Sequence, residues 1–138
     1  MKPKVVELRF PASSQYLVLA RLSVAGVAPV AGLSVDQLAD LKLAVTEACA
    51  NVVRHAYPDG ERGEVHLRLV VEDGAFSVEV MDSGRGMTAL PGIVWDPAAL
   101  HEHGMGLTIV DSVVDELEID SPPDGGTIVR FRKLLAVG

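Results

Sequence analysis

Two polar side chains within a predicted helix over residues 34–56 are spaced for metal-assisted chemistry. Glu47 and Asn51 are four residues apart, so they lie on one helix face about one turn, roughly 6 Å, from each other. A carboxylate and an amide oxygen placed in this way can share a hard cation through water molecules, and Mg²⁺ needs few protein ligands when phosphates supply the rest. The alternative is a solvated helix face without a ligand.

An acidic residue followed by a Gly-x-Gly loop ends a predicted strand. Glycine lets the backbone approach a ligand closely, and the carboxylate of Asp82 can accept a hydrogen bond from an exocyclic amine such as that of adenine. Gly84 and Gly86 also imitate the dinucleotide-binding fingerprint, but Pro91 and Gly92 are incompatible with the long helix that this fingerprint requires. No P-loop sequence occurs. A tight surface turn is the remaining alternative.

Two further glycine segments lie where a nucleotide could be bound. Gly104 and Gly106 open directly into a predicted helix, whose first N–H groups and positive dipole end suit phosphate. Gly126 precedes Thr127 at the start of the last predicted strand, where a hydroxyl could meet the base. An ordinary flexible helix entry and a simple hairpin turn are the respective alternatives.

The secondary structure that must position these residues follows from the hydrophobic pattern. An Asp-Gly pair between two alternating runs predicts a hairpin with a two-residue turn. Ser34 and Gln37 form a capping box that starts the helix carrying Glu47. In chain order, the predicted elements are a strand at 5–10, helices at 13–26 and 34–56, strands at 65–71 and 76–80, a glycine-rich loop at 82–106, a helix at 107–115, and strands at 117–121 and 126–135. This order predicts a two-layer α/β sandwich, in which a mixed, mostly antiparallel sheet carries its helices on one face.

Size and charge restrict the classes of function. The 138 residues fit one domain over 1–138, with 49% hydrophobic and 22% charged residues. The net charge of −7 comes without a basic run, which argues against nucleic acid as a direct partner. The single Cys49 excludes an intrachain disulfide and is expected to pack inside a helix. The first ten residues lack the apolar core of a signal peptide, and glycine and proline interrupt the longest uncharged stretch, at 22–35. We therefore expect a soluble cytoplasmic protein without a membrane span.

Taken together, these motifs resemble the N, G1 and G2 boxes of the GHKL (Bergerat-fold) ATPases. They are E-x-x-x-N on a helix, D-x-G-x-G after a strand, G-x-G-L at a helix start and G-G-T in the last hairpin, in that order. Within this family, residues 47–57 (EACANVVRHAY) look like the N box of the anti-sigma factor serine kinases almost throughout. The resemblance covers residues 5–135 and implies the Bergerat ATP-binding fold.

The resemblance implies a role for each matching residue. Glu47 would act as general base on a substrate hydroxyl and Asn51 would hold Mg²⁺, roles that fit phosphoryl transfer from ATP. Asp82 would bind the adenine amino group. The other residues implied to contact the nucleotide are His55, Gly84, Gly86, Met87, Gly104, Met105, Gly106, Leu107 and Thr127. Residues 87–103 correspond to the ATP lid. The lid contains the metal-like pair His101 and His103, which we do not expect to bind metal.

The same resemblance implies a serine/threonine-protein kinase that regulates transcription. Members are typically homodimers that hold either a sigma factor or an anti-anti-sigma protein, and they phosphorylate a serine on the latter. An arginine in the first helix contacts these partners, and Arg21 stands where it is expected. The alternatives are a non-catalytic module that binds ATP as a structural ligand and a histidine kinase catalytic domain. Glu47 favours the enzyme, because a pure binder needs no base, and the short lid disfavours a histidine kinase.

Overall fold

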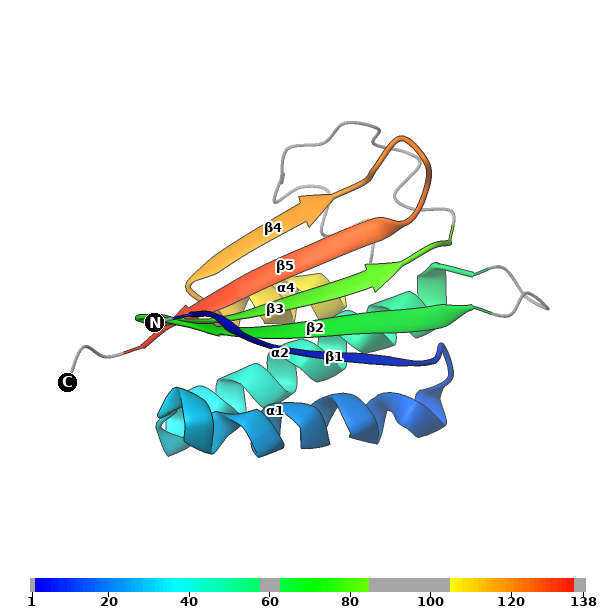
Figure 1. Cartoon of the computed structure of the whole chain (residues 1–138). Helices are drawn as coiled ribbons and strands as arrows, with labels where there is room; N and C mark the ends of the chain where they lie inside the picture. Colours follow the sequence, from blue (N-terminus) through cyan, green and yellow to red (C-terminus); the bar gives the residue numbers. More distant parts are fainter. Residues whose placement is uncertain (1, 58–62, 85–104, 136–138) are drawn as a thin grey trace.

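The computed structural model describes residues 2–57, 63–84 and 105–135, and these form two layers (Figure 1). Five described strands make one sheet in the order β1-β2-β3-β5-β4, and every neighbouring pair is antiparallel. The strands are β1 (Lys4–Pro11), β2 (Glu64–Glu72), β3 (Ala75–Asp82), β4 (Glu116–Asp120) and β5 (Thr127–Leu134). The helices are α1 (Leu17–Ala31), α2 (Val35–His55) and α4 (Met105–Val113), with a 3₁₀ turn (Ser14–Tyr16) before α1. The predicted sandwich with helices on one face is confirmed, and the mostly antiparallel sheet is antiparallel in all its described pairs.

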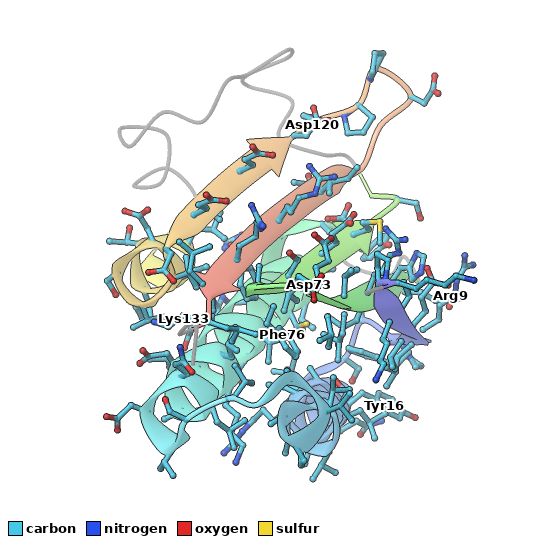
Figure 2. The ribbon with its side chains drawn as sticks, turned by 60° about the vertical axis from the view of Figure 1, so that its left-hand side comes forward. Arg9, Tyr16, Asp73, Phe76, Asp120 and Lys133 are labelled. Atoms are coloured by element: carbon cyan, nitrogen blue, oxygen red, sulfur yellow. The ribbon has the colours of Figure 1, made fainter. Side chains whose placement is uncertain are left out.

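The hydrophobic core fills the space between the two layers. Alternate residues of each strand face the helices, and Phe76 of β3 and Phe131 of β5 are completely buried there. Figure 2 shows Phe76 between the sheet and the helices. Lys133 ties the end of β5 to both neighbouring helices, because its Nζ donates to Asp40 of α2 at 2.9 Å and to the Val113 carbonyl of α4 at 2.8 Å. The helix layer is therefore attached to the sheet by packing and by specific polar contacts.

The opposite face of the sheet carries charged side chains in cross-strand pairs. Arg68 of β2 contacts Glu79 of β3 at 3.1 Å, and Arg130 of β5 contacts Glu79 at 3.5 Å and Glu118 of β4 at 3.2 Å. Opposite charges on neighbouring strands favour this register. These pairs place each of the two arginines beside at least one carboxylate.

Helix α1 is longer than the sequence predicts. It was expected to end near Gly26, but it continues to Ala31 and includes Pro29 in its last turns. The continuation buries Ala28 and packs the partly buried Val27 and Ala31 against the core. The helix ends where Gly32 adopts the left-handed conformation, with φ of 72°.

The segment Ser14–Ala31 is long and apolar enough to cross a membrane by length and composition alone, and 17% of it is buried. The core helix of a soluble protein passes the same test. In this structure α1 packs against α2, and its buried residues are Ala20, Val24 and Ala28. Its apolar composition is thus partly explained by the core, while its outer side stays exposed.

Candidate functional site

Helix α2 begins as the sequence predicts. The Ser34 hydroxyl accepts the N–H of Gln37 at 3.1 Å, and the Gln37 side chain accepts the Ser34 N–H at 3.0 Å. Six apolar residues of the helix belong to the hydrophobic core: Leu41, Ala44, Val45, Ala48, Cys49 and Val52. Burial raises the pKa of the Cys49 thiol to about 12, so this residue is an unreactive packing residue. The buried face fixes which side of α2 carries Glu47 and Asn51.

Glu47 lies beside the start of α4. A Cβ added to Gly106 would lie 3.3 Å from Glu47 Oε2 and 3.2 Å from Arg54 Nη2. One carboxylate and one guanidinium from α2 therefore border the first turn of α4, where backbone N–H groups lack helical partners. Gly106 is itself buried at this contact between α2 and α4.

Asn51 presents a polar atom without a partner. Its Oδ1 is buried and makes no hydrogen bond with any residue that the structure describes. A buried acceptor left in this state costs free energy unless a ligand, water or ion satisfies it. An amide oxygen is a suitable ligand for a hard cation such as Mg²⁺, so the residue present fits the ion that the motif implies.

Asp82 ends β3 as a half-buried acceptor. It lies opposite Thr127 of β5 in the strand register, and its Oδ1 accepts the N–H of Gly84 at 2.9 Å. Burial raises the pKa of Asp82 above its ordinary value of 3.8, and hydrogen bonds from the backbone amides of Gly84 and Thr127 offset part of this rise. The carboxylate keeps further lone pairs for a donor such as an amino group.

The turn between β4 and β5 holds the loop that follows Asp82. The N–H of Gly126 donates to the Gly84 carbonyl at 2.9 Å, and Gly126 has a φ of 83°. A Cβ at Gly126 would overlap the carbonyl oxygen of Asp82, and a Cβ at Gly84 would overlap the carbonyl oxygen of Ala56. These glycines therefore allow three backbone segments to meet. Figure 1 shows the ends of α2 and β3 and the β4–β5 turn on the same side of the molecule.

Tyr57 is a site residue that the sequence analysis did not single out. It follows α2 directly, and its hydroxyl contacts the backbone of Ser83, the residue after Asp82, at 3.1 Å. It also donates to the Glu64 carbonyl of β2 at 2.8 Å. The available signal was its place at the end of the EACANVVRHAY segment, where a hydroxyl follows the helix that carries Glu47.

The structure places some of the remaining predicted residues, and the others lie outside its described part. Leu107 has a completely buried side chain, so only its backbone can face a ligand, and His55 is exposed in the last turn of α2. Met105 begins α4. Gly86, Met87, Gly104 and the predicted lid at 87–103, with its two histidines, lie outside the described residues. Arg21 is exposed on α1, which is a different element from those that form the site.

The described part of the site therefore combines four chemical features. It has a carboxylate beside a helix N-terminus, an orphaned amide oxygen one turn along the same helix, a half-buried carboxylate at a strand end, and a glycine-lined backbone junction. Among the described residues, no cluster of three or more His, Cys, Asp or Glu could hold a metal ion by itself. A ligand with its own phosphates, an amine donor and an associated cation would satisfy these groups together.

Comparison with known protein families identifies a matching domain. Residues 10–133 match the family model described as histidine kinase-like ATPase domain. A serine-protein kinase RsbW from Bacillus velezensis is 34% identical over 94% of this chain and 85% of its own length. An anti-sigma F factor from Caldanaerobacter subterraneus is 33% identical over 95% of this chain and 94% of its own length. The anti-sigma F factor of Bacillus subtilis is also 33% identical, over 95% of this chain and 92% of its own length.

Two solved structures share the fold. One contains the RsbU and RsbW domains of a Mycobacterium tuberculosis protein, with a TM-score of 0.70, 19% identity and coverage of 96% of this chain. The match takes up 32% of that longer chain. The other is the SiaB–SiaC complex from Pseudomonas aeruginosa, with a TM-score of 0.57, 17% identity and coverage of 94% of this chain and 89% of that chain. At these identities the likeness concerns the fold alone.

Proposed function

Because the chain belongs to the histidine kinase-like ATPase domain family, we propose that it is an ATP-dependent serine protein kinase that also acts as an anti-sigma factor. Its relatives carry the names serine-protein kinase and anti-sigma F factor, and they align with it over almost their whole length. The observation that carries the kinase activity is the position of Glu47 beside Gly106, at the first turn of α4. A module that only binds nucleotide has no use for a carboxylate there.

ATP binding follows from the backbone junction and Asp82. The carboxylate of Asp82 accepts a hydrogen bond from the adenine amino group, and Gly84 and Thr127 lie next to this carboxylate. The first turn of α4, with Gly106 and the backbone of Leu107, supplies N–H groups to the phosphates. In a chain with net charge −7, such backbone groups are a suitable way to bind an anion. Gly86, Met87, Gly104, Met105 and His55 complete the proposed contacts.

Asn51 is the proposed protein ligand of Mg²⁺. Its buried Oδ1 lacks a described partner, and a metal bound mainly by phosphates needs few protein oxygens. Bound Mg²⁺ would neutralise charge on the phosphates. Asn51 would hold this cation close to the helix that carries the proposed base.

Glu47 is the proposed general base of phosphoryl transfer. It takes the proton from the hydroxyl of a partner serine while the hydroxyl oxygen bonds to the γ-phosphorus. The bond from the γ-phosphorus to the oxygen bridging it to the β-phosphate breaks, and ADP leaves with that oxygen. Arg54, whose Nη2 borders the same glycine as Glu47, adds positive charge near this position.

The proposed partners are a sigma factor and an anti-anti-sigma protein that carries the target serine. Arg21 and the apolar residues exposed beside it on α1, including Leu22 with 61% of its surface exposed, form a suitable protein-binding surface. A homodimer would use exposed apolar surface of this kind, such as Val5 and Val6 on the edge strand β1. We place this activity in the cytoplasm, without direct contact to nucleic acid or membrane.

The test is a Glu47→Gln variant, with Glu72→Gln on the outer face of β2 as the matched control. ATP affinity is measured by calorimetry, and serine phosphorylation of an anti-anti-sigma protein from the same genome is measured with labelled ATP and Mg²⁺. We expect Glu47→Gln to keep ATP binding and to slow phosphorylation by roughly 10²–10⁴-fold, as for the loss of a general base. The control should match the wild type.

A second candidate function is a regulatory module that binds ATP without using it. Its supporting observation is that Asn51, Asp82 and the glycine junction are sufficient for binding. No serine phosphorylation by the wild type despite ATP binding would favour this module over the kinase. Equal phosphorylation by the wild type and Glu47→Gln would instead refute Glu47 as the general base.

A further inference from the structure

The hydroxyl of Tyr57 connects three segments that are distant in the sequence. It stands directly after α2, donates to the Glu64 carbonyl at the start of β2 at 2.8 Å, and accepts the Ser83 N–H at 3.1 Å. The Ser83 hydroxyl lies a further 3.4 Å from the same oxygen. One phenolic oxygen therefore uses both its donor and its acceptor capacity on backbone groups.

The ring of Tyr57 is held in place by a glycine. A Cβ at Gly63 would overlap the ring, so the aromatic side chain packs directly on the backbone at that position. The Gly63 carbonyl also accepts the N–H of Ala12 at 2.9 Å, which connects this backbone to the end of β1. A side chain fixed on one side by backbone cannot easily change rotamer, so its hydroxyl has a defined position.

The loop after β3 is thus held from two sides. On one side, Tyr57 binds Ser83 and the Ala56 carbonyl contacts Gly84. On the other side, Gly126 donates to the Gly84 carbonyl at 2.9 Å. Asp82 lies at the start of this loop, and its carboxylate accepts the Gly84 N–H. The direction of the Asp82 carboxylate therefore depends on how residues 83–84 are held.

We propose that Tyr57 is a positioning residue for Asp82, and that its hydroxyl thereby sets the preference of the site for adenine over a 6-oxo base. This inference rests on the proposed ATP site. A carboxylate accepts a hydrogen bond from the amino group of adenine, whereas at the same position a 6-oxo purine presents a carbonyl oxygen, which is itself an acceptor. Discrimination between the two bases therefore requires a carboxylate held at a defined angle. Removing the Tyr57 hydroxyl frees Ser83 and widens the range of angles that Asp82 can adopt.

A second reading is that Tyr57 only stabilises the fold. In that case its loss would lower the unfolding free energy without changing the selectivity of the folded protein. The two readings differ in the ratio of affinities for two nucleotides, because a global loss of stability affects both equally. ATP and inosine triphosphate are the suitable pair, since they differ only in the 6-amino group of adenine, which becomes a 6-oxo group with a hydrogen on N1 in hypoxanthine.

The experiment compares wild type, Tyr57→Phe and Tyr16→Phe, the same change at the only other tyrosine of the chain. Dissociation constants for ATP and inosine triphosphate are measured by calorimetry below the melting temperature of each variant. We expect Tyr57→Phe to bind ATP about three- to tenfold more weakly, the worth of one or two hydrogen bonds. Binding of inosine triphosphate should change little, so the ATP preference falls, while Tyr16→Phe keeps the wild-type preference.

The outcomes separate this inference from the proposed function. A wild type that binds no ATP would refute the proposed site itself. A wild type that binds ATP, with an unchanged nucleotide preference in Tyr57→Phe, would refute only the positioning role. Hydrogen exchange provides a check on the wild type alone: the Ser83 amide should be protected, and an amide that exchanges as fast as an open loop would also overturn the inference.

Discussion

Two glycines at the candidate site face different kinds of neighbour, so the same substitution should have different effects. A methyl group at Gly84 would overlap the Ala56 carbonyl, which belongs to the backbone and has little freedom to move. A methyl group at Gly106 would lie 3.2 Å from Arg54 Nη2 and 3.3 Å from Glu47 Oε2. These two atoms are the ends of flexible side chains, and a shift of a few tenths of an ångström relieves the contact.

The magnitudes follow from these neighbours. Gly84→Ala forces a backbone displacement and should reduce the unfolding free energy by about 1–3 kcal/mol, the usual cost of overpacking. Gly106→Ala replaces a helical glycine, and the higher helix propensity of alanine stabilises the fold by up to about 1 kcal/mol. This gain offsets the cost of the tight contacts with Arg54 and Glu47, so the net change in stability should be near zero. The displaced Glu47 carboxylate should nevertheless slow phosphorylation about tenfold, because a misplacement of about 1 Å can cost about 10²-fold.

Urea unfolding of both variants measures the stability difference, and the labelled-ATP assay measures the rate of serine phosphorylation. The reasoning predicts a destabilised Gly84→Ala variant and a stable but slow Gly106→Ala variant. Wild-type stability of Gly84→Ala would refute the close approach of the loop to the end of α2. A full phosphorylation rate in Gly106→Ala would refute the position of Glu47 at the start of α4.

Two further substitutions test the adenine contact and the partner surface. Asp82→Asn should weaken ATP binding strongly in calorimetry, since an amide presents one acceptor oxygen where the carboxylate presents two. Burial raises the pKa of Asp82 in the folded state above its ordinary value of 3.8. Ionisation of Asp82 therefore destabilises the wild type as the pH rises from 3.8 through the raised pKa. The unfolding free energy of Asp82→Asn relative to the wild type should therefore rise over this window and then level off, whereas a difference independent of pH would contradict the burial of this charge. Arg21→Ala should weaken binding of the sigma factor or anti-anti-sigma protein by about tenfold or more, as for an interface arginine, and leave ATP affinity unchanged; unchanged partner affinity in a pull-down titration would exclude Arg21 from the interface.

The local features of the fold could be predicted because they depend on neighbouring residues. The capping box at Ser34 and Gln37 and the turn at Gly74, with a φ of 77°, are both found as expected. Each depends on hydrogen bonds or side-chain spacing within a few residues. The end of α1 could not be predicted in this way, because residues beyond Gly26, including Val27, Ala28 and Ala31, pack against parts of the core that are distant in the sequence.

The sequence by itself determined which chemical groups are present and their order. Residues four apart, such as Glu47 and Asn51, lie about one turn apart in any α-helix, and the glycines after Asp82 can be read directly from the sequence. Only the tertiary structure decided how these groups meet. It pairs β3 with β5 rather than β4, so that Thr127 lies opposite Asp82.

The role inferred for Tyr57 could be recognised only from the tertiary structure. Its hydroxyl meets the backbone of Glu64, seven residues away, and that of Ser83, 26 residues away. No periodicity or local propensity encodes such contacts, because they form only when β2 and β3 pack next to the end of α2. The packing of α4 on α2 brings Gly106 against Glu47 in the same way, so this part of the candidate site also depends on contacts between distant segments.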